Sequence, residues 1–88
     1  IGGAGFRNAG PAYPEMARQR GQQGAVVLDL RVDAEGRVVG AEVAQSSGHP
    51  MLDAAAQRAV LNWRFRPALD AGRPVEAQLR STVRFRLD

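Results

Sequence analysis

The chain ends in the longest alternating segment of its sequence, VEAQLRSTVRFRLD, which runs from Val75 to Asp88. Read two residues at a time, this segment has a mostly apolar face and a polar, arginine-bearing face. The apolar face comprises Val75, Ala77, Leu79, Ser81, Val83, Phe85 and Leu87, and the polar face comprises Glu76, Gln78, Arg80, Thr82, Arg84 and Arg86. Because side chains alternate across a β-strand, this pattern predicts a long strand with one buried face and one wet face.

The upstream residues predict a short helix followed by a β-hairpin. PAYPEMARQRG (residues 11–21) indicates a helix, with Pro14 in the first turn and Gly21 as its stop. AVVLDLRVD and VVGAEVAQS (25–33 and 38–46) both alternate with a period of two and are separated by the turn residues of DAEGR. In the first strand the inward residues are expected to be Val26, Leu28, Leu30 and Val32, and in the second Val39, Ala41 and Val43.

After SSGHP the hydrophobic period changes from two to between three and four, which predicts the main helix over residues 50–63. Its core-facing residues are expected to be Leu52, Ala55, Ala56, Ala59, Val60 and Trp63. RFRPALDAGRP (64–74) reads as a short extended piece and a loop. The predicted order is helix, strand, strand, helix, strand. This order indicates the α+β class, with a three-stranded antiparallel sheet and one short and one longer helix packed on one face.

The length of 88 residues indicates one domain. We expect residues 11–88 to form it, and residues 1–10, IGGAGFRNAG, to be a flexible leader or the end of a linker. The chain starts at Ile1 and not at Met, so we interpret it as a piece of a longer protein, with any membrane anchor upstream. It contains no cysteine, which leaves no disulfide or thiolate metal site to stabilise it.

The sequence shows no arrangement typical of an enzyme. Its only histidine, His49, lies near Ser46, Ser47 and Asp53, but SSGHP lacks the Gly-x-Ser-x-Gly turn that exposes a nucleophile. We expect these polar side chains to cap the helix that follows. No histidine or carboxylate spacing indicates a metal site, so we predict no catalytic residue, no metal and no cofactor.

The positive charge is concentrated near the end of the chain. Residues 1–63 hold six Arg against six acidic residues, whereas residues 64–88 hold six Arg against three, and these account for the net charge of +3. Nucleic acid is the obvious partner to consider for such a surface. However, Phe85 lies on the apolar face, where it cannot stack bases, and Asp29 and Asp33 on the wet face would repel phosphates. We therefore predict no nucleic-acid binding.

The last strand also raises the question of its open edge. A three-stranded sheet has two edge strands, and the final segment is free of proline after Val75. An exposed edge is either protected by charges, here Arg80, Arg84 and Arg86, or used to capture another strand. The pattern alone supports both interpretations equally.

Several stretches in one order resemble the C-terminal domain of the TonB family, the energy-transducing proteins of Gram-negative bacteria. They are YPEMARQRGQQGAVVLDLRVDAEGRV, SSGHPMLDAAAQRAV, NWRFRPA and GRPVEAQLRSTVRFRL, and together they cover about residues 11–87. Each motif alone is weak, but the ordered set is specific. The related protein TolA has a similar fold but generally lacks the Tyr-Pro and Ser-Ser-Gly-x-x-x-Leu-Asp features.

The resemblance implies a role in the periplasm without enzymatic activity. Such proteins are anchored in the inner membrane by an N-terminal helix, are energised by ExbB–ExbD, and serve outer-membrane transporters for siderophores, haem or cobalamin. Their C-terminal domain grips the transporter's TonB box by strand addition (β-augmentation). The box-pairing strand would be Arg80, Ser81, Thr82, Val83, Arg84, Phe85, Arg86 and Leu87, and the Tyr-Pro region near the box and plug would be Pro11, Tyr13, Pro14, Met16 and Arg18.

The sequence departs from the family pattern at two positions. Gly10 stands where a Gln often precedes the Pro-x-Tyr-Pro motif, and Met16 occupies a position that is basic in some members. A contact by that Gln and a salt bridge from residue 16 are therefore not expected, with Arg18 or Arg20 as a replacement cation. The alternative function is a self-associating, TolA-like structural module of the cell envelope, in which the open edge pairs with its twin as a homodimer.

Overall fold

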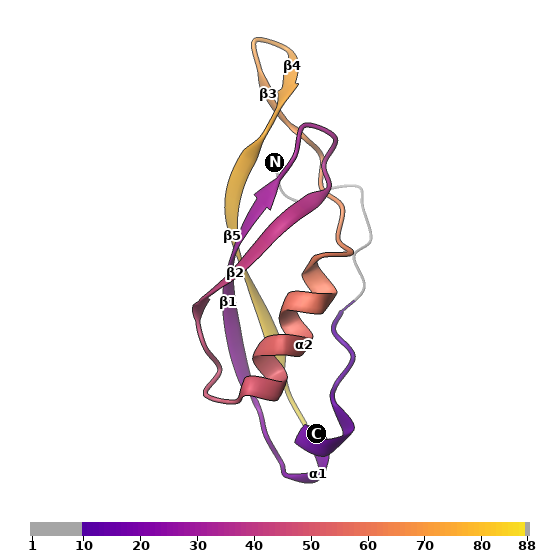
Figure 1. Cartoon of the computed structure of the whole chain (residues 1–88), viewed down its shortest axis with the longest axis vertical. Coiled ribbons are helices and arrows are strands. Elements are labelled where there is room, and N and C mark those ends of the chain that lie inside the picture. Colours follow the sequence, from indigo (N-terminus) through magenta and orange to yellow (C-terminus); the bar gives the residue numbers. More distant parts are fainter. Residues whose placement is uncertain (1–9, 88) are drawn as a thin grey trace.

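The computed structural model describes residues 10–87, which form two helices, a three-stranded antiparallel sheet and a separate small hairpin (Figure 1). The helices are α1 (Glu15–Gln19) and α2 (Pro50–Val60), and the strands are β1 (Gly24–Val32), β2 (Val38–Gln45), β3 (Ala68–Asp70), β4 (Arg73–Val75) and β5 (Ala77–Phe85). The sheet order is β2-β1-β5, so the predicted α+β class and three-stranded sheet are confirmed. Of the expected leader, residues 1–9 lie outside the described residues.

The core lies between the sheet and α2, and β1 supplies its centre. The inward residues of β1, Val26, Leu28, Leu30 and Val32, are at most 1% exposed. Helix α2 packs against β1 and β2 and buries Leu52 together with two small residues, Ala55 and Ala56. Because alanine side chains are short, they let the helix axis approach the strands closely. No helix among residues 10–87 is long and apolar enough to cross a membrane.

Helix α1 ends where the sequence predicts. Gly21 adopts a φ of +67°, its N–H donates to the Arg18 carbonyl at 3.1 Å, and the Gln22 N–H donates to the Ala17 carbonyl at 2.9 Å. This pair of bonds is a Schellman motif, in which glycine tolerates the left-handed backbone. Pro14 lies one position earlier than expected, because it is the N-cap residue and Glu15 begins the helix.

Helix α2 is shorter than the expected 50–63, because it ends at Val60. A tight turn follows, in which the Trp63 N–H donates to the Val60 carbonyl at 3.0 Å. Trp63 still packs against the core, with its ring 6.3 Å from that of Phe65. In this turn the hydrogen bond joins residues three positions apart, so the apolar residues keep a nearly helical spacing. The sequence pattern therefore did not reveal where the helix ends.

The prediction that Val39 faces the core is wrong. Val32 pairs with Val38 and Arg31 pairs with Gly40, so Val39 is an extra residue in a β-bulge. The bulge buries Val38, which is 7% exposed, and leaves Val39 47% exposed. Beyond it, Ala41 and Val43 pack against the core as expected. A bulge shifts the two-residue alternation by one, which the alternation itself cannot reveal.

The predicted loop 64–74 contains a second hairpin, which projects beyond the main sheet (Figure 1). Its turn residues Ala71 and Gly72 both have positive φ, as a two-residue turn of type I′ requires. Val75 belongs to β4, and β5 begins at Ala77 and ends at Phe85, so the predicted single strand 75–88 is divided. The predicted faces of β5 are confirmed, because Val83 and Phe85 are buried and Thr82 and Arg84 are exposed.

A close backbone approach fixes the β1–β2 turn against the segment after α2. Gly36 has a φ of +85°, and its carbonyl accepts a 2.8 Å hydrogen bond from the Phe65 N–H. A Cβ atom on Gly36 would lie 2.0 Å from the Phe65 carbonyl oxygen. Gly72 has a similar φ of +80°, but no atom lies within 4 Å of its Cβ position. Substitutions at these two glycines can therefore be compared to distinguish the cost of backbone strain from the cost of a steric clash.

We expect Gly72→Ala to lower the free energy of unfolding by about 1 kcal/mol, the cost of a left-handed alanine. Gly36→Ala should lower it by about a further 1–3 kcal/mol, because the turn and the Phe65 segment must move apart. Urea denaturation followed by circular dichroism measures both values. Equal losses for the two variants would show that the Gly36–Phe65 approach does not constrain the fold.

Candidate functional site

Strand β5 is an edge of the sheet. It pairs with β1 on one side, and no strand among residues 10–87 pairs with its other side. The pairing is regular along all nine residues, from Gly24 opposite Phe85 to Val32 opposite Ala77. The uncovered side is therefore an uninterrupted row of backbone groups that could pair with another strand.

Two hydrogen bonds show which backbone groups of β5 point outward. The Asp33 N–H donates to the Arg37 carbonyl at 2.8 Å, on the β2 side, so the adjacent residue Val32 turns its backbone toward β5. At the other end, the Leu87 N–H donates to Gln23 Oε1 at 2.7 Å, on the β1 side. Since directions alternate, the odd-numbered residues of β5 face β1. The outward N–H and C=O groups belong to Gln78, Arg80, Thr82 and Arg84.

The opposite edge of the sheet is different. β2 carries two irregularities against β1, one at Val39 and one at Ala44, where the register shifts. Bulges interrupt the spacing of backbone groups and twist an edge, which is a common protection against strand pairing. Of the two edges in the described sheet, β5 is thus the one suited to extended pairing.

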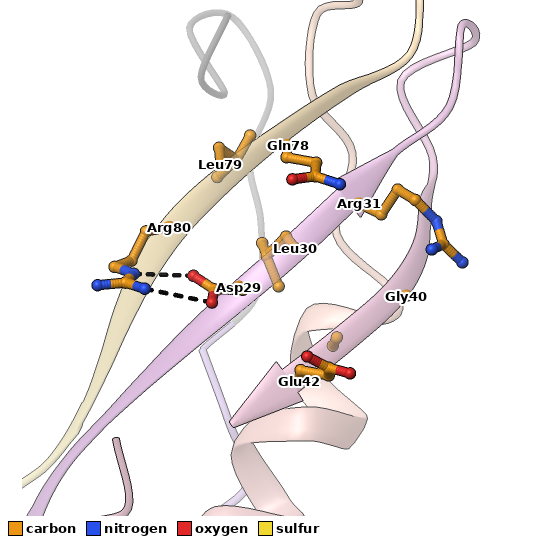
Figure 2. Close-up of a pocket in the computed structure, with 9 residues that line it drawn as sticks. Asp29, Leu30, Arg31, Gly40, Glu42, Gln78, Leu79 and Arg80 are labelled. Atoms are coloured by element: carbon orange, nitrogen blue, oxygen red, sulfur yellow. Dashed lines mark hydrogen bonds and ion pairs between the residues drawn. The ribbon is translucent and has the colours of Figure 1, made fainter. Parts of the chain in front are cut away.

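The wet face of the sheet has a shallow depression of about 560 Å³ that crosses all three strands (Figure 2). Within it, Arg80 donates to Asp29 through Nε at 2.8 Å and through a terminal nitrogen at 3.2 Å. The two residues lie opposite each other in register, although they are 51 positions apart in the chain. The hydrogen bond from Arg80 lowers the pKa of Asp29, and the same bond raises the pKa of Arg80. This two-bond ion pair makes Arg80 a structural partner of β1.

The Tyr-Pro region lies against the C-terminal end of β5. The Tyr13 ring meets the Phe85 ring edge to face, with centroids 5.4 Å apart, and its hydroxyl donates to the Gln22 carbonyl. The Arg18 guanidinium stands 5.3 Å from the centre of the Tyr13 ring. In Figure 1, α1 lies beside the C-terminal end of the chain. The structure thus brings together the two groups of residues that the sequence singled out.

The remaining predicted residues differ in their surroundings. Pro11 and Pro14 are half-buried, whereas Met16 is 50% exposed on α1 and Arg20 is exposed at its C-terminal end. Arg86 and Leu87 follow the last paired residue of β5 and so extend beyond the strand. The local sequence did not mark Asp29 or Gln23 as neighbours of the site, because the pairing of β1 with β5 brings both of them there.

The SSGHP loop is built differently from the expected cap. His49 is the N-cap residue of α2, and its side chain makes no capping hydrogen bond. Instead the Asp53 carboxylate of α2 accepts bonds from the Ser46 hydroxyl, from the Ser47 N–H at 2.9 Å and from the Ser47 hydroxyl at 2.8 Å. Helix α2 therefore holds the loop, and the Asp53 carboxylate binds serines rather than orienting a histidine base. Within residues 10–87 no group of three or more His, Cys, Asp or Glu could hold a metal ion.

The fold and the uncovered β5 edge define a small α+β domain suited to strand pairing. The chain belongs to the family described as Gram-negative bacterial TonB protein C-terminal, whose family model matches residues 9–87. The recognition of this family from the ordered motifs is confirmed.

Individual relatives agree with this assignment. Protein TonB of Vibrio cholerae is 36% identical over 78 residues, which cover 89% of this chain and 32% of that protein. Protein tonB2 of Pseudomonas aeruginosa is 36% identical over 86 residues, with 97% and 32% covered. The chain therefore spans about a third of the length of these curated relatives. The solution NMR structure of the Pseudomonas aeruginosa TonB CTD matches with a TM-score of 0.79 at 30% identity, covering 94% of this chain and 84% of that one.

The hydrogen bonds between Asp53 and the SSGHP loop lead to a prediction about how the stability of the fold depends on pH. Partial burial alone would raise the pKa of Asp53, but the hydrogen bonds from Ser46 and Ser47 outweigh it and the pKa is lowered. A carboxylate with a lowered folded pKa stabilises the fold above its unfolded pKa of about 3.9, and this contribution is lost as the pH falls through the folded value.

We expect Asp53→Asn to be less stable than the wild type at neutral pH. The difference should shrink only as the pH falls below about 3.9 and through the lowered folded pKa of Asp53, where the wild-type carboxylate becomes protonated. Urea unfolding across this range gives the difference. In a carboxyl NMR titration, the double variant Ser46→Ala, Ser47→Ala should show Asp53 with a raised pKa. An unchanged Asp53 pKa in that variant would rule out the serines as its cause.

Proposed function

We propose that this chain is the peptide-capturing, force-transmitting domain of a TonB-type energy transducer. In this proposal the TonB box of an outer-membrane transporter adds as a strand to the outer side of β5. The observation that supports it most directly is the unbroken nine-residue register between β5 and β1, which leaves an edge without bulges. The bulges of β2 direct pairing away from the opposite edge.

The outward backbone groups of Gln78, Arg80, Thr82 and Arg84 would supply the main-chain hydrogen bonds to the box. Main-chain pairing depends little on side-chain identity, so one edge could serve several transporters with modest affinity. A pull along the added strand loads several of these bonds in shear at the same time. On the inner side, β5 is held by its pairing with β1 over its full length, which would carry the force into the core.

We infer the role of the whole protein from the family to which this chain belongs. We propose that a segment outside this chain anchors it to the inner membrane and receives energy from ExbB–ExbD, so that the domain works in the periplasm. The transported substrates would be siderophores, haem or cobalamin, and the transfer of force would need neither catalysis nor a cofactor. The Tyr-Pro region, packed on Phe85 through Tyr13, would lie near the box and the transporter plug.

We expect Thr82→Pro to abolish binding of a synthetic TonB-box peptide while the domain stays folded. Thr82 is exposed and its N–H points away from β1, so proline removes a donor to the added strand without removing one from the sheet. Isothermal titration calorimetry measures binding, and circular dichroism measures folding.

Two variants control this test. Thr82→Ala removes the side chain but keeps the N–H, and should bind the peptide like the wild type. Ser81→Pro removes a donor to β1 and should unfold the domain, which verifies the direction of the backbone groups. If folded Thr82→Pro binds the peptide as well as the wild type, strand addition at β5 is wrong.

A second candidate function is self-association, as in a TolA-like structural module. A twofold antiparallel pairing of β5 with full overlap would centre on Ser81, place Arg80 opposite Thr82 and place Arg84 opposite Gln78. No two arginines would then face each other, so charge does not prevent such a dimer.

If the edge serves both roles, sedimentation velocity at rising protein concentration should show a dimer that the TonB-box peptide dissociates. Thr82→Pro should remain a monomer at every concentration, because it lacks the central donor for either partner. A dimer that persists at saturating peptide would place self-association on another surface.

A further inference from the structure

We propose that Arg84, and not Arg80, gives the β5 edge its preference for an acidic residue, because Asp29 occupies Arg80. The ligand is an extended peptide whose carboxylate side chain lies on the wet face of the added strand beside Arg84. This inference rests on the proposed strand addition and specifies which partner sequences the edge selects.

Arg80 and Arg84 offer the same backbone to a partner. Both lie on β5, both side chains are exposed on the wet face, and both N–H groups point away from β1. An added strand would place one side chain beside each of them on the same face, whichever direction the strand runs. Any difference between the two positions therefore comes from their neighbours on β1.

Those neighbours on β1 differ in charge, because one is acidic and the other is uncharged. Arg80 faces Asp29, which takes two of its guanidinium hydrogen bonds, at 2.8 and 3.2 Å. Figure 2 shows the guanidinium of Arg80 turned from β5 toward Asp29 on β1. This pairing uses two of the five donors of Arg80 and offsets its charge with that of Asp29, so Arg80 attracts a carboxylate on the other side less than an unpaired arginine does.

Among residues 10–87, Arg84 has no such partner. It faces Ala25 on β1, and its neighbours on the same face of β5 are Thr82 and Arg86. Within residues 10–87, its guanidinium takes part in none of the hydrogen bonds or ion pairs of the wet face. Its charge and five donors are therefore available to a carboxylate on an added strand.

The remaining arginine, Arg86, contributes less. Arg86 follows the last paired residue of β5, so the sheet does not hold a partner residue beside it in place. Arg80 and Arg84 are four residues apart, or about 13 Å along a strand. This separation exceeds the screening length of about 8 Å at physiological ionic strength, so each arginine acts on its own neighbour.

The test is a glutamate scan of a neutral, extended TonB-box-like peptide, with Glu compared with Gln at each position. For the wild type we expect one position at which Glu binds about two- to fivefold more tightly than Gln, the size of one cross-strand charge pair. Arg84→Gln should abolish this preference, while Arg80→Gln and Arg86→Gln should keep it. Isothermal titration calorimetry measures the ratios.

Asp29→Asn gives the sharper readout, because it should release Arg80. A second position of Glu preference should then appear, four residues from the first along the peptide. The double variant Asp29→Asn, Arg84→Gln should show only the second position. Because Arg80 and Arg84 are four residues apart, the two preferred Glu positions should also be four residues apart in the peptide. This spacing is expected whatever the register and direction of the added strand.

The possible failures are distinguishable. If the neutral TonB-box-like peptide, in which no position carries Glu, does not bind the wild type, the proposed strand addition fails. If it binds but Arg80→Gln removes the Glu preference, or Asp29→Asn adds no second position, the masking of Arg80 by Asp29 is overturned. If Arg84→Gln keeps the wild-type preference, Arg84 is not the selecting residue.

Discussion

The antiparallel pairing of β5 with β1 is the constraint on which the rest of the structure depends. It brings Val83 and Phe85, near the end of the chain, into the core built by β1 and α2. The same pairing leaves the other side of β5 uncovered and sets Arg80 opposite Asp29. One register therefore determines the core, the open edge and the charges beside that edge.

The two edges of the sheet show how a small domain keeps one pairing surface and protects another. Regular β2 pairing would leave two straight edges, and either could capture an unwanted strand. The bulges at Val39 and Ala44 interrupt one of them, while β5 stays regular over its whole length. Along β5, exposed arginines would discourage unspecific pairing, and under the proposed strand addition Asp29 would limit how many of them act on a partner.

Most of the fold could be predicted because its main strands and helix each have one apolar face that is buried and one polar face that is exposed. The alternation in β1 and β5 and the helical spacing around Leu52 established which residues form the core, and Gly21 marked the end of α1. The incorrect predictions lie where the backbone leaves regular helix or strand geometry although the apolar residues of the sequence keep their spacing. The bulge at Val39 exposed a residue expected inside, and the turn after Val60 continued the helical spacing to Trp63.

Local residue order also predicted the β5 segment and the Tyr-Pro region as a candidate site, since a strand with two unlike faces and a set of ordered motifs can be read along the chain. It could not show that Tyr13 packs on Phe85, that Asp29 binds Arg80 or which N–H groups face outward. These facts depend on pairing between residues distant in sequence. A register shift of a single residue would reverse every face and every backbone direction, so only the tertiary structure could decide them.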